Sequence, residues 1–330
     1  MKNILHHLFE HKTLTAGEAE EVLVRIATGN YNEAQITAFL TVFRMRSITV
    51  EELKGFRNAL LRLCTPVDLS EYNGIDLCGT GGDGKNTFNI STLASFLVAG
   101  AGEKVTKHGN YGVSSFCGSS NVMESFGYRF KRTELELKED LDKAGICFLH
   151  APLFNSAMKN VAPIRRDLGV RTFFNMLGPL VNPSCPRHQI VGVFDLELAR
   201  LYQYLLQETD TRFTVIHSID GYDEVSLTDK VKLVGNSMEE LVEPRQLGFE
   251  NLKPEDLYGG TTVEEAAKLF VKILKREGTE AQNSVVIANA GLAIHCIHPE
   301  ISRAEAMDRA KESLESGSAY HVLNTLINRQ

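Results

Sequence analysis

The hydrophobic pattern of this chain changes its period near residue 75, and no other feature constrains the fold as strongly. Up to residue 64, apolar side chains recur at three- and four-residue spacing, which predicts helices only. After residue 75, short apolar runs alternate with amphipathic stretches, which is typical of an α/β domain with a mostly parallel sheet. The segment 64–74 contains Pro66 and Asn73-Gly74 and is predicted to be a linker. We therefore expect the α/β fold class, with a small all-helical domain and a large α/β domain.

The apolar runs and their neighbours give the expected order of elements. Strands are expected at 75–78, 104–109, 146–151, 189–195, 213–218 and 285–294. Helices are expected at 92–101, 136–144, 197–208 and 264–276, and helical and loop signals over 155–185 interrupt the alternation. Two N-terminal helices should begin with capping boxes, at Thr15–Glu18 and Thr49–Glu52.

Composition excludes several classes of protein. A length of 330 residues allows two domains, and a net charge of −7 argues against a nucleic-acid binder. The six cysteines show neither a CxxC motif nor a disulfide framework, so we expect free thiols. The sequence has no signal peptide pattern and no apolar run long enough to span a bilayer, which predicts a cytoplasmic protein without membrane contact.

A glycine-rich loop after the first expected strand carries the strongest local signal. It reads GTGGDGKNTFNIST over residues 79–92. The spacing fits GxGxxG of dinucleotide sites, but a polar run stands where that helix should begin. It also resembles a P-loop, but Asn86 stands where a Ser or Thr must bind Mg²⁺. A tight turn without a ligand would lose the backbone entropy of its glycines on folding without a compensating interaction. We favour an anion cradle, in which backbone N–H groups and a helix N-terminus capped by Ser91 or Thr92 converge on a phosphate.

Five motifs in fixed order then carry a family resemblance. They are residues 79–92, KHGN (107–110), VSS (113–115), MKNVAPIRRDLGVRTFFNMLGPLVNP (158–183) and DGYDEVS (220–226). Together they resemble anthranilate phosphoribosyltransferase, which joins anthranilate to 5-phosphoribosyl-1-pyrophosphate (PRPP) in tryptophan biosynthesis. The resemblance implies a homodimer and a helical dimerisation domain of residues 1–68 and 164–184. It assigns residues 69–163 and 185–330 to the α/β domain that binds PRPP.

The resemblance also implies the site residues. PRPP would be bound by Gly79, Gly82, Asp83, Thr87, Asn89, Ile90, Ser91, Thr92, Lys107, Ser115 and Ser119. Anthranilate would contact Gly79, His108, Asn110, Arg165 and Gly178, with the Arg165 guanidinium on its carboxylate. Mg²⁺, as two ions per site, would be bound by Ser91, Asp223 and Glu224. No general base is predicted, because the aromatic amine is already neutral at pH 7.

The chain departs from the family pattern at four positions, where Tyr111, Phe116, Asn121 and Asn155 replace the usual Arg, Lys, Asp and His. These changes bear on PRPP affinity and on the identity of the acceptor. Two kinds of alternative therefore stay open. One is a different acceptor, or a pyrimidine nucleoside phosphorylase, on the same fold. The other is a non-catalytic relative that binds nucleic acid.

Overall fold

The chain forms two compact units in the computed structural model, which describes residues 1–112 and 116–328. The first unit contains residues 1–66 and 151–183, and the second contains residues 67–150 and 184–330. Residues 151–163 thus lie in the first unit, whereas the sequence-based division assigned them to the larger part. None of the helices in the described part of the chain combines the length and apolar content that crossing a bilayer requires.

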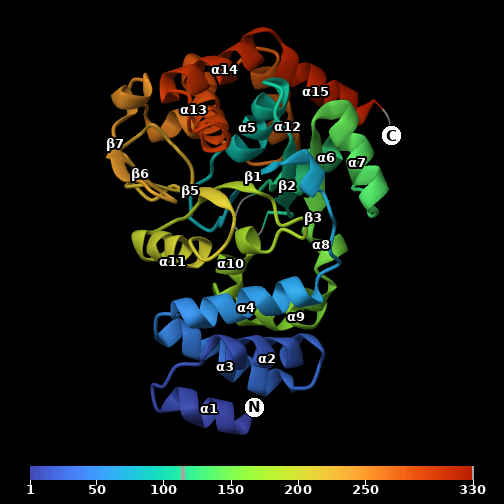
Figure 1. The fold of residues 1–330 in the computed structure, drawn as a ribbon, viewed down its shortest axis with the longest axis vertical. Coiled ribbons are helices and arrows are strands. Elements are labelled where there is room, and N and C mark those ends of the chain that lie inside the picture. The colour runs from blue at the N-terminus through green and yellow to red at the C-terminus, as the bar shows by residue number, and fades with distance from the viewer. Residues whose placement is uncertain (113–115, 329–330) are drawn as a thin grey trace. The chain divides into compact units, whose positions relative to one another are not determined.

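The first unit is helical throughout (Figure 1). Its N-terminal helices are α1 (Lys2–Phe9), α2 (Ala16–Ala27), α3 (Glu33–Met45) and α4 (Val50–Leu63). Its mid-chain part contains α8 (Ala151–Phe154), α9 (Ala162–Leu168) and α10 (Phe174–Leu177), with 3₁₀ turns at Ser156–Asn160 and Gly178–Leu180. Both predicted capping boxes are confirmed, because Thr15 and Thr49 each exchange hydrogen bonds with the glutamate three residues later.

A cluster of phenylalanine rings joins the N-terminal helices of this unit to its mid-chain part. Phe56 of α4 stacks on Phe173 with ring centroids 4.3 Å apart, and Phe39 and Phe43 of α3 meet both rings edge-on. Aromatic pairs of this kind add about 0.5–1.5 kcal/mol each beyond the burial of their surface. Two segments about a hundred residues apart in sequence therefore share one core.

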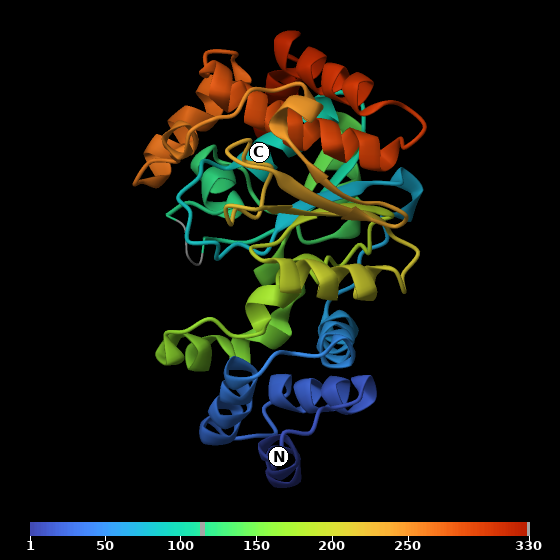
Figure 2. The same cartoon turned by 90° about the vertical axis from the view of Figure 1, so that its left-hand side faces the viewer.

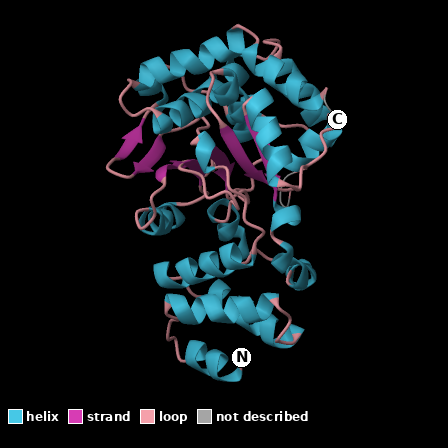
Figure 3. Cartoon of the chain, turned by 45° about the vertical axis from the view of Figure 1, so that its right-hand side comes forward, coloured by secondary structure: helices cyan, strands magenta, loops and turns pink. Residues whose placement is uncertain are grey.

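The second unit is built on a seven-stranded sheet of order β3-β2-β1-β4-β5-β6-β7. The strands are magenta in Figure 3, with helices on both sides of them. The strands are β1 (Ile75–Gly79), β2 (Val105–Gly109), β3 (Ile146–His150), β4 (His188–Gly192), β5 (Arg212–Ser218), β6 (Val231–Gly235) and β7 (Glu239–Val242). Strands β1 to β5 are mutually parallel, and β6 and β7 extend the sheet antiparallel. The prediction of a mostly parallel sheet is confirmed, although β6 and β7 were not predicted.

Helices cover both faces of this sheet. They are α5 (Ile90–Gly100), α6 (Ser119–Ser125), α7 (Glu134–Ala144), α11 (Leu196–Leu206), α12 (Val263–Leu274), α13 (Glu280–Ile297), α14 (Arg303–Glu315) and α15 (Ser318–Ile327). Three short 3₁₀ turns, at Ser70–Tyr72, Pro244–Leu247 and Pro254–Leu257, complete the unit. Figures 1 and 2 show α5 and α12–α15 on one face of the sheet and α11 on the other.

The prediction of a strand at 285–294 is wrong, because this run lies within α13. Every residue from Val285 to Ile294 is buried, so this part of the helix has no exposed polar face to reveal its 3.6-residue period. A short apolar run without such a face is compatible with a buried strand or a buried helix. Burial on all sides is the physical reason for the error.

Candidate functional site

The candidate site of the second unit lies where strand order reverses in the sheet. From β1 the chain passes outward to β2 and β3, then returns to β4 on the other side of β1. Gly79 at the end of β1 pairs with Gly192 at the end of β4. Open α/β sheets bind ligands at such a switch point, beyond the carboxyl ends of their strands. The glycine-rich loop begins at this point.

The glycines of this region are explained by backbone geometry. Gly81, Gly82 and Gly84 have φ values of +63°, +75° and +76°, which side chains with a Cβ rarely adopt. Gly79 and Gly192 have no room for a Cβ, because it would collide with Asp223. The loop is therefore shaped to bring the acidic segment 220–226 against the end of the sheet.

Two carboxylates of that acidic segment accept hydrogen bonds from the glycine loop and the helix that follows it. Asp223 Oδ2 accepts from the backbone N–H of Gly81 at 2.7 Å. Glu224 Oε1 accepts from the N–H of Ser91 at 3.0 Å, and Glu224 Oε2 lies 3.5 Å from the hydroxyl of Thr87. Segments about 140 residues apart in sequence thus meet in one polar cluster.

The carboxyls of this cluster lie close enough to disfavour one another's ionisation. Burial raises the pKa of Asp223 to about 7, and the negative charge of Asp83 contributes to the shift. Burial, together with the charges of Asp223 and Asp83, raises the pKa of Glu224 well above its ordinary value. Burial also raises the pKa of Asp83. Acidic groups arranged in this way are typical of a site that receives a cation.

The start of α5 differs from the sequence prediction. We expected Ser91 or Thr92 to cap this helix, but the helix begins at Ile90 and Asn89 is the N-cap residue. The amide of Asn89 makes no capping bond and instead donates to the carbonyl of Cys117 at 2.9 Å. The backbone N–H of Ser91, in the first turn of α5, donates instead to the carboxylate of Glu224 in a distant loop. A distant partner of this kind leaves no trace in the local sequence.

The end of β2 contributes Lys107 and His108, both buried. The ammonium of Lys107 donates to the carbonyl of Leu77 in β1. Burial lowers the pKa of Lys107, and the negative charges of Asp76 and Glu224 oppose that shift. Asp76, which was not predicted as a site residue, is fully buried and accepts from the N–H of His108 at 3.0 Å. The signal that could have found it is an aspartate inside the apolar run IDLC.

The segment after β2 is held by its own side chains and by α6. The hydroxyl of Ser119 donates to the carbonyl of Asn110 at 3.3 Å. Asn121 Oδ1 accepts from the N–H groups of both Gly112 and Gly118. The predicted PRPP residue Ser115 lies outside the described residues.

Tyr111 and Phe116 are two of the four departures from the family pattern, and both follow β2 in the chain. The hydroxyl of Tyr111 donates to Glu124 at 2.7 Å, and its ring meets the His150 ring edge-on at 4.9 Å. Phe116 is 64% exposed. Tyr111 thus contacts its neighbours through an uncharged hydroxyl, which donates to a carboxylate, and through a ring contact, where the family has a cationic side chain.

The remaining predicted anthranilate residues, Arg165 and Gly178, belong to the first unit. The Arg165 guanidinium lies 5.2 Å from the centre of the Phe174 ring, and one of its nitrogens donates to Asn175 Oδ1 at 3.4 Å. Burial lowers the pKa of Arg165. Within its own unit this arginine is thus a half-buried cation without a carboxylate partner among the described residues.

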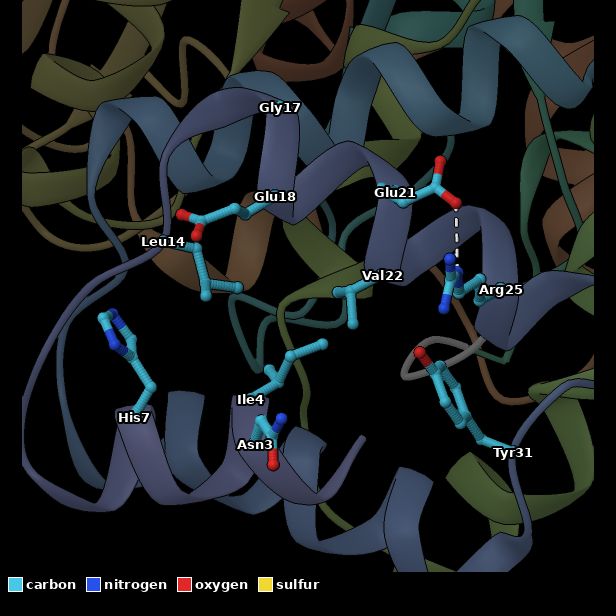
Figure 4. Close-up of a pocket in the computed structure, with 10 residues that line it drawn as sticks. All are labelled: Asn3, Ile4, His7, Leu14, Gly17, Glu18, Glu21, Val22, Arg25 and Tyr31. Carbon is cyan, nitrogen blue, oxygen red and sulfur yellow. Dashed lines mark hydrogen bonds and ion pairs between the residues drawn. The ribbon is translucent and has the colours of Figure 1, made fainter.

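Two cavities lie away from these residues. One, of about 560 Å³, lies between α1 and α2 of the first unit, with Ile4, Leu14 and Val22 pointing into it and the Glu21–Arg25 ion pair on its rim (Figure 4). The other, of about 440 Å³, lies in the second unit near Cys185 and Arg187. None of the predicted site residues lines either cavity. Within residues 1–112 and 116–328, no three His, Cys, Asp or Glu side chains are arranged to hold a metal by themselves.

Comparison with known proteins gives a consistent result over both units. A family described as "Glycosyl transferase family, a/b domain" matches residues 71–320, and one described as "Glycosyl transferase family, helical bundle domain" matches residues 2–64. The anthranilate phosphoribosyltransferase of Flavobacterium psychrophilum is 59% identical over 99% of this chain and 98% of its own length. The corresponding protein of Bacteroides fragilis strain YCH46 is 54% identical over 99% of both chains.

Solved structures agree with the sequence relatives. The anthranilate phosphoribosyltransferase from Thermus thermophilus superposes with a TM-score of 0.91 at 31% identity, covering 98% of both chains. The enzyme from Saccharomyces cerevisiae in complex with PRPP and Mg superposes with a TM-score of 0.89 at 26% identity, covering 98% of this chain and 96% of that one. By family match, near-complete coverage and fold, this chain belongs to the anthranilate phosphoribosyltransferase family.

Proposed function

We propose that this chain transfers the phosphoribosyl group of PRPP to the amino nitrogen of anthranilate. The bond from ribose C1 to the diphosphate oxygen breaks, a C1–N bond forms, and pyrophosphate and the amine proton leave. The observation that carries the proposal is the meeting of Asp83, Asp223 and Glu224 with a glycine loop at the switch point of the sheet. The membership of the family and the PRPP–Mg complex of the yeast relative support it.

The acidic cluster fits Mg²⁺ by the chemistry of its donors. Burial raises the pKa of all three carboxyls, and neighbouring negative charges add to the shift at Asp223 and Glu224. A hard cation would offset both effects. Mg²⁺ prefers oxygen ligands, keeps several waters, and is commonly bound by one or two carboxylates plus substrate phosphates. We infer that Asp223, Glu224 and Ser91 hold it, as two ions. When bound, Mg²⁺ neutralises charge that develops on the diphosphate.

The chain's own residues position the donor. Backbone N–H groups of the glycine loop and of the first turn of α5 form a ready anion site. The residues that we propose contact PRPP are Gly79, Gly82, Asp83, Thr87, Asn89, Ile90, Ser91, Thr92, Lys107, Ser115 and Ser119. Positioning two reactants in this way can account for about 7–11 kcal/mol of the barrier.

For the acceptor we propose Gly79, His108 and Asn110 from the second unit, and Arg165 and Gly178 from the first. A guanidinium binds a carboxylate through two parallel hydrogen bonds, which suits Arg165 to the anthranilate carboxylate. No general base is needed, because the aromatic amine carries a lone pair at neutral pH. We further propose that the chain is a cytoplasmic homodimer that associates through its helical part, residues 1–68 and 164–184.

The test follows anthranilate fluorescence in mixtures of the purified protein with PRPP and Mg²⁺. Decay that requires all three components supports the proposal. Mg²⁺-dependent binding of PRPP without decay would mean a different acceptor. Phosphate-dependent cleavage of a pyrimidine nucleoside without Mg²⁺ would instead identify a phosphorylase, and salt-sensitive retention of DNA would identify a nucleic-acid binder.

A further inference from the structure

Lys85 follows the glycine loop directly and is not one of the residues proposed to bind PRPP, anthranilate or Mg²⁺. Its backbone is fixed on both sides. Its N–H donates to Asp83 Oδ1 at 3.0 Å, and the next residue, Asn86, exchanges hydrogen bonds with the 259–260 segment. The side chain therefore starts from a defined point beside the acidic cluster.

The side chain of Lys85 reaches across to the acidic segment. Its ammonium lies 4.5 Å from the centre of the Tyr222 ring, and its Cε would lie 3.9 Å from a Cβ at Gly221. Tyr222 is 4% exposed and directly precedes Asp223, so the aromatic surface beneath the ammonium is itself firmly placed. A cation over an aromatic face is attracted by the negative charge of that face. The contact thus orients the ammonium at the junction of the two loops that form the candidate site.

The ammonium still has hydrogen-bonding capacity. A lysine ammonium has three N–H donors, and an aromatic face satisfies none of them as an oxygen would. Other lysines of this unit pair with glutamates, as Lys138, Lys230 and Lys232 do at 2.7–3.0 Å. In the described part of the chain, no oxygen pairs with Lys85 Nζ, although its charge partly opposes the rise in the pKa of neighbouring Asp83 that burial causes.

We propose that Lys85 is a phosphate-binding residue that donates to an oxygen of the diphosphate group of PRPP and of released pyrophosphate. A lysine ammonium acts toward phosphate as a point charge, and its place over Tyr222, on the residue that directly follows the glycine loop, suits that role. The proposal rests on the proposed function, which supplies the diphosphate. It makes Lys85 a stabiliser of the charge that appears on the leaving group as the C1–O bond breaks.

The test measures the affinity of inorganic pyrophosphate by calorimetry, with and without Mg²⁺, and the KM values for both substrates. Lys85→Met should weaken pyrophosphate binding roughly 10- to 100-fold, since hydrogen bonds to charged groups contribute about that factor. The loss should shrink at high salt, and Lys85→Arg should recover most of the affinity. KM for PRPP should rise in Lys85→Met while KM for anthranilate stays the same.

Lys275→Met is the matched control, because Lys275 also lies over a tyrosine, Tyr320, at 5.4 Å but far along the chain from the glycine loop. It should bind pyrophosphate like the wild type. Unchanged affinity in Lys85→Met would overturn the inference. So would an equal loss in Lys85→Arg accompanied by a lower melting temperature, which would indicate a merely structural tether. A wild type that binds pyrophosphate through Lys85 but does not consume anthranilate would overturn the proposed function and leave this inference standing.

Discussion

Asp223 and Glu224 show how two adjacent side chains can serve one site. The Asp223 carboxylate turns to the N–H of Gly81, and the Glu224 carboxylate turns to the N–H of Ser91. In a regular strand such neighbours would point to opposite faces, but these two lie in a loop after β5. Family resemblance suggested the pair. The participation of Asp83 in the same electrostatic cluster emerges only from the fold.

The double variant Asp223→Asn with Glu224→Gln should abolish Mg²⁺-dependent turnover, because amide oxygens retain the two backbone hydrogen bonds but lose the charge that holds the cation. Its melting temperature should stay the same or rise, since repulsion among buried carboxylates is removed. Asp308→Asn with Glu312→Gln, which changes one exposed Asp and one exposed Glu on α14, is the control and should leave turnover intact. Unchanged turnover in the first variant would contradict the metal assignment.

Glu52 is a buried charge that connects three segments of the first unit. It is fully buried in α4 and accepts hydrogen bonds from the Arg46 guanidinium and from the N–H groups of Leu14 and Thr49. Glu52→Ala should lower the free energy of unfolding by about 3–5 kcal/mol, because Arg46 would lose its partner. Glu51→Ala, at the exposed neighbouring position, should change it by less than about 0.5 kcal/mol. Chemical denaturation of both variants measures the difference, and similar losses would refute the argument.

Glu52 should also make the stability of the protein depend on pH. Burial by itself would raise the pKa of Glu52, but hydrogen bonds from Arg46, Leu14 and Thr49 outweigh it and lower the pKa below its ordinary value of 4.5. A lowered folded-state pKa means that this contribution to stability is present above pH 4.5 and is lost as the pH falls through the folded-state value. The wild type should therefore lose more stability on acidification below pH 4.5 than Glu52→Gln does. If the stabilities of the two proteins fell in parallel on acidification, Glu52 would not be the source of this pH dependence.

At the scale of elements, the predictions succeeded where local signals are strong. The strands β1 to β5 and the capped helices α2 and α4 carry clear periodicity and capping residues, and each was predicted. The errors have a common cause. Helix α13 is buried on all sides, and the cap of α5 is a distant carboxylate, so tertiary contacts rather than local sequence decide both.

Gly192 tests the close approach of β4 to the acidic segment. A Cβ at this position would collide with the carbonyl of Asp223, and a backbone atom cannot move aside cheaply. Gly192→Ala should therefore displace the 220–226 loop, reduce turnover at least tenfold, and lower stability by about 1–3 kcal/mol through overpacking.

Gly17→Ala is the matched control for that variant. Gly17 lies in α2, and a Cβ there would have nothing within 4 Å. The free energy of unfolding of this variant should rise by up to about 1 kcal/mol, because alanine loses less backbone entropy than glycine when a helix forms. Turnover and thermal unfolding of the two variants can be compared directly. Equal changes in turnover and stability in the two variants would show that the close contact between Gly192 and Asp223 does not restrict the side chain at residue 192.

At the scale of the whole molecule, the two units follow from the change of hydrophobic period near residue 75. The segregation of helices from the α/β part is visible in the sequence, and so is the interruption over 155–185. The ring cluster that joins Phe173 to Phe39, Phe43 and Phe56 could not be predicted from the sequence, because it depends on which apolar helix faces pack together. The switch point of the sheet likewise requires the strand order, which periodicity cannot supply.

The central claim is that one reaction joins the PRPP donor to the anthranilate acceptor on this chain. Its most direct test quantifies pyrophosphate and phosphoribosylanthranilate in the same Mg²⁺-containing reaction. The account predicts equal amounts of the two products, and no pyrophosphate when anthranilate is omitted. Pyrophosphate released without loss of anthranilate would contradict it, because the donor site would then be serving a different acceptor.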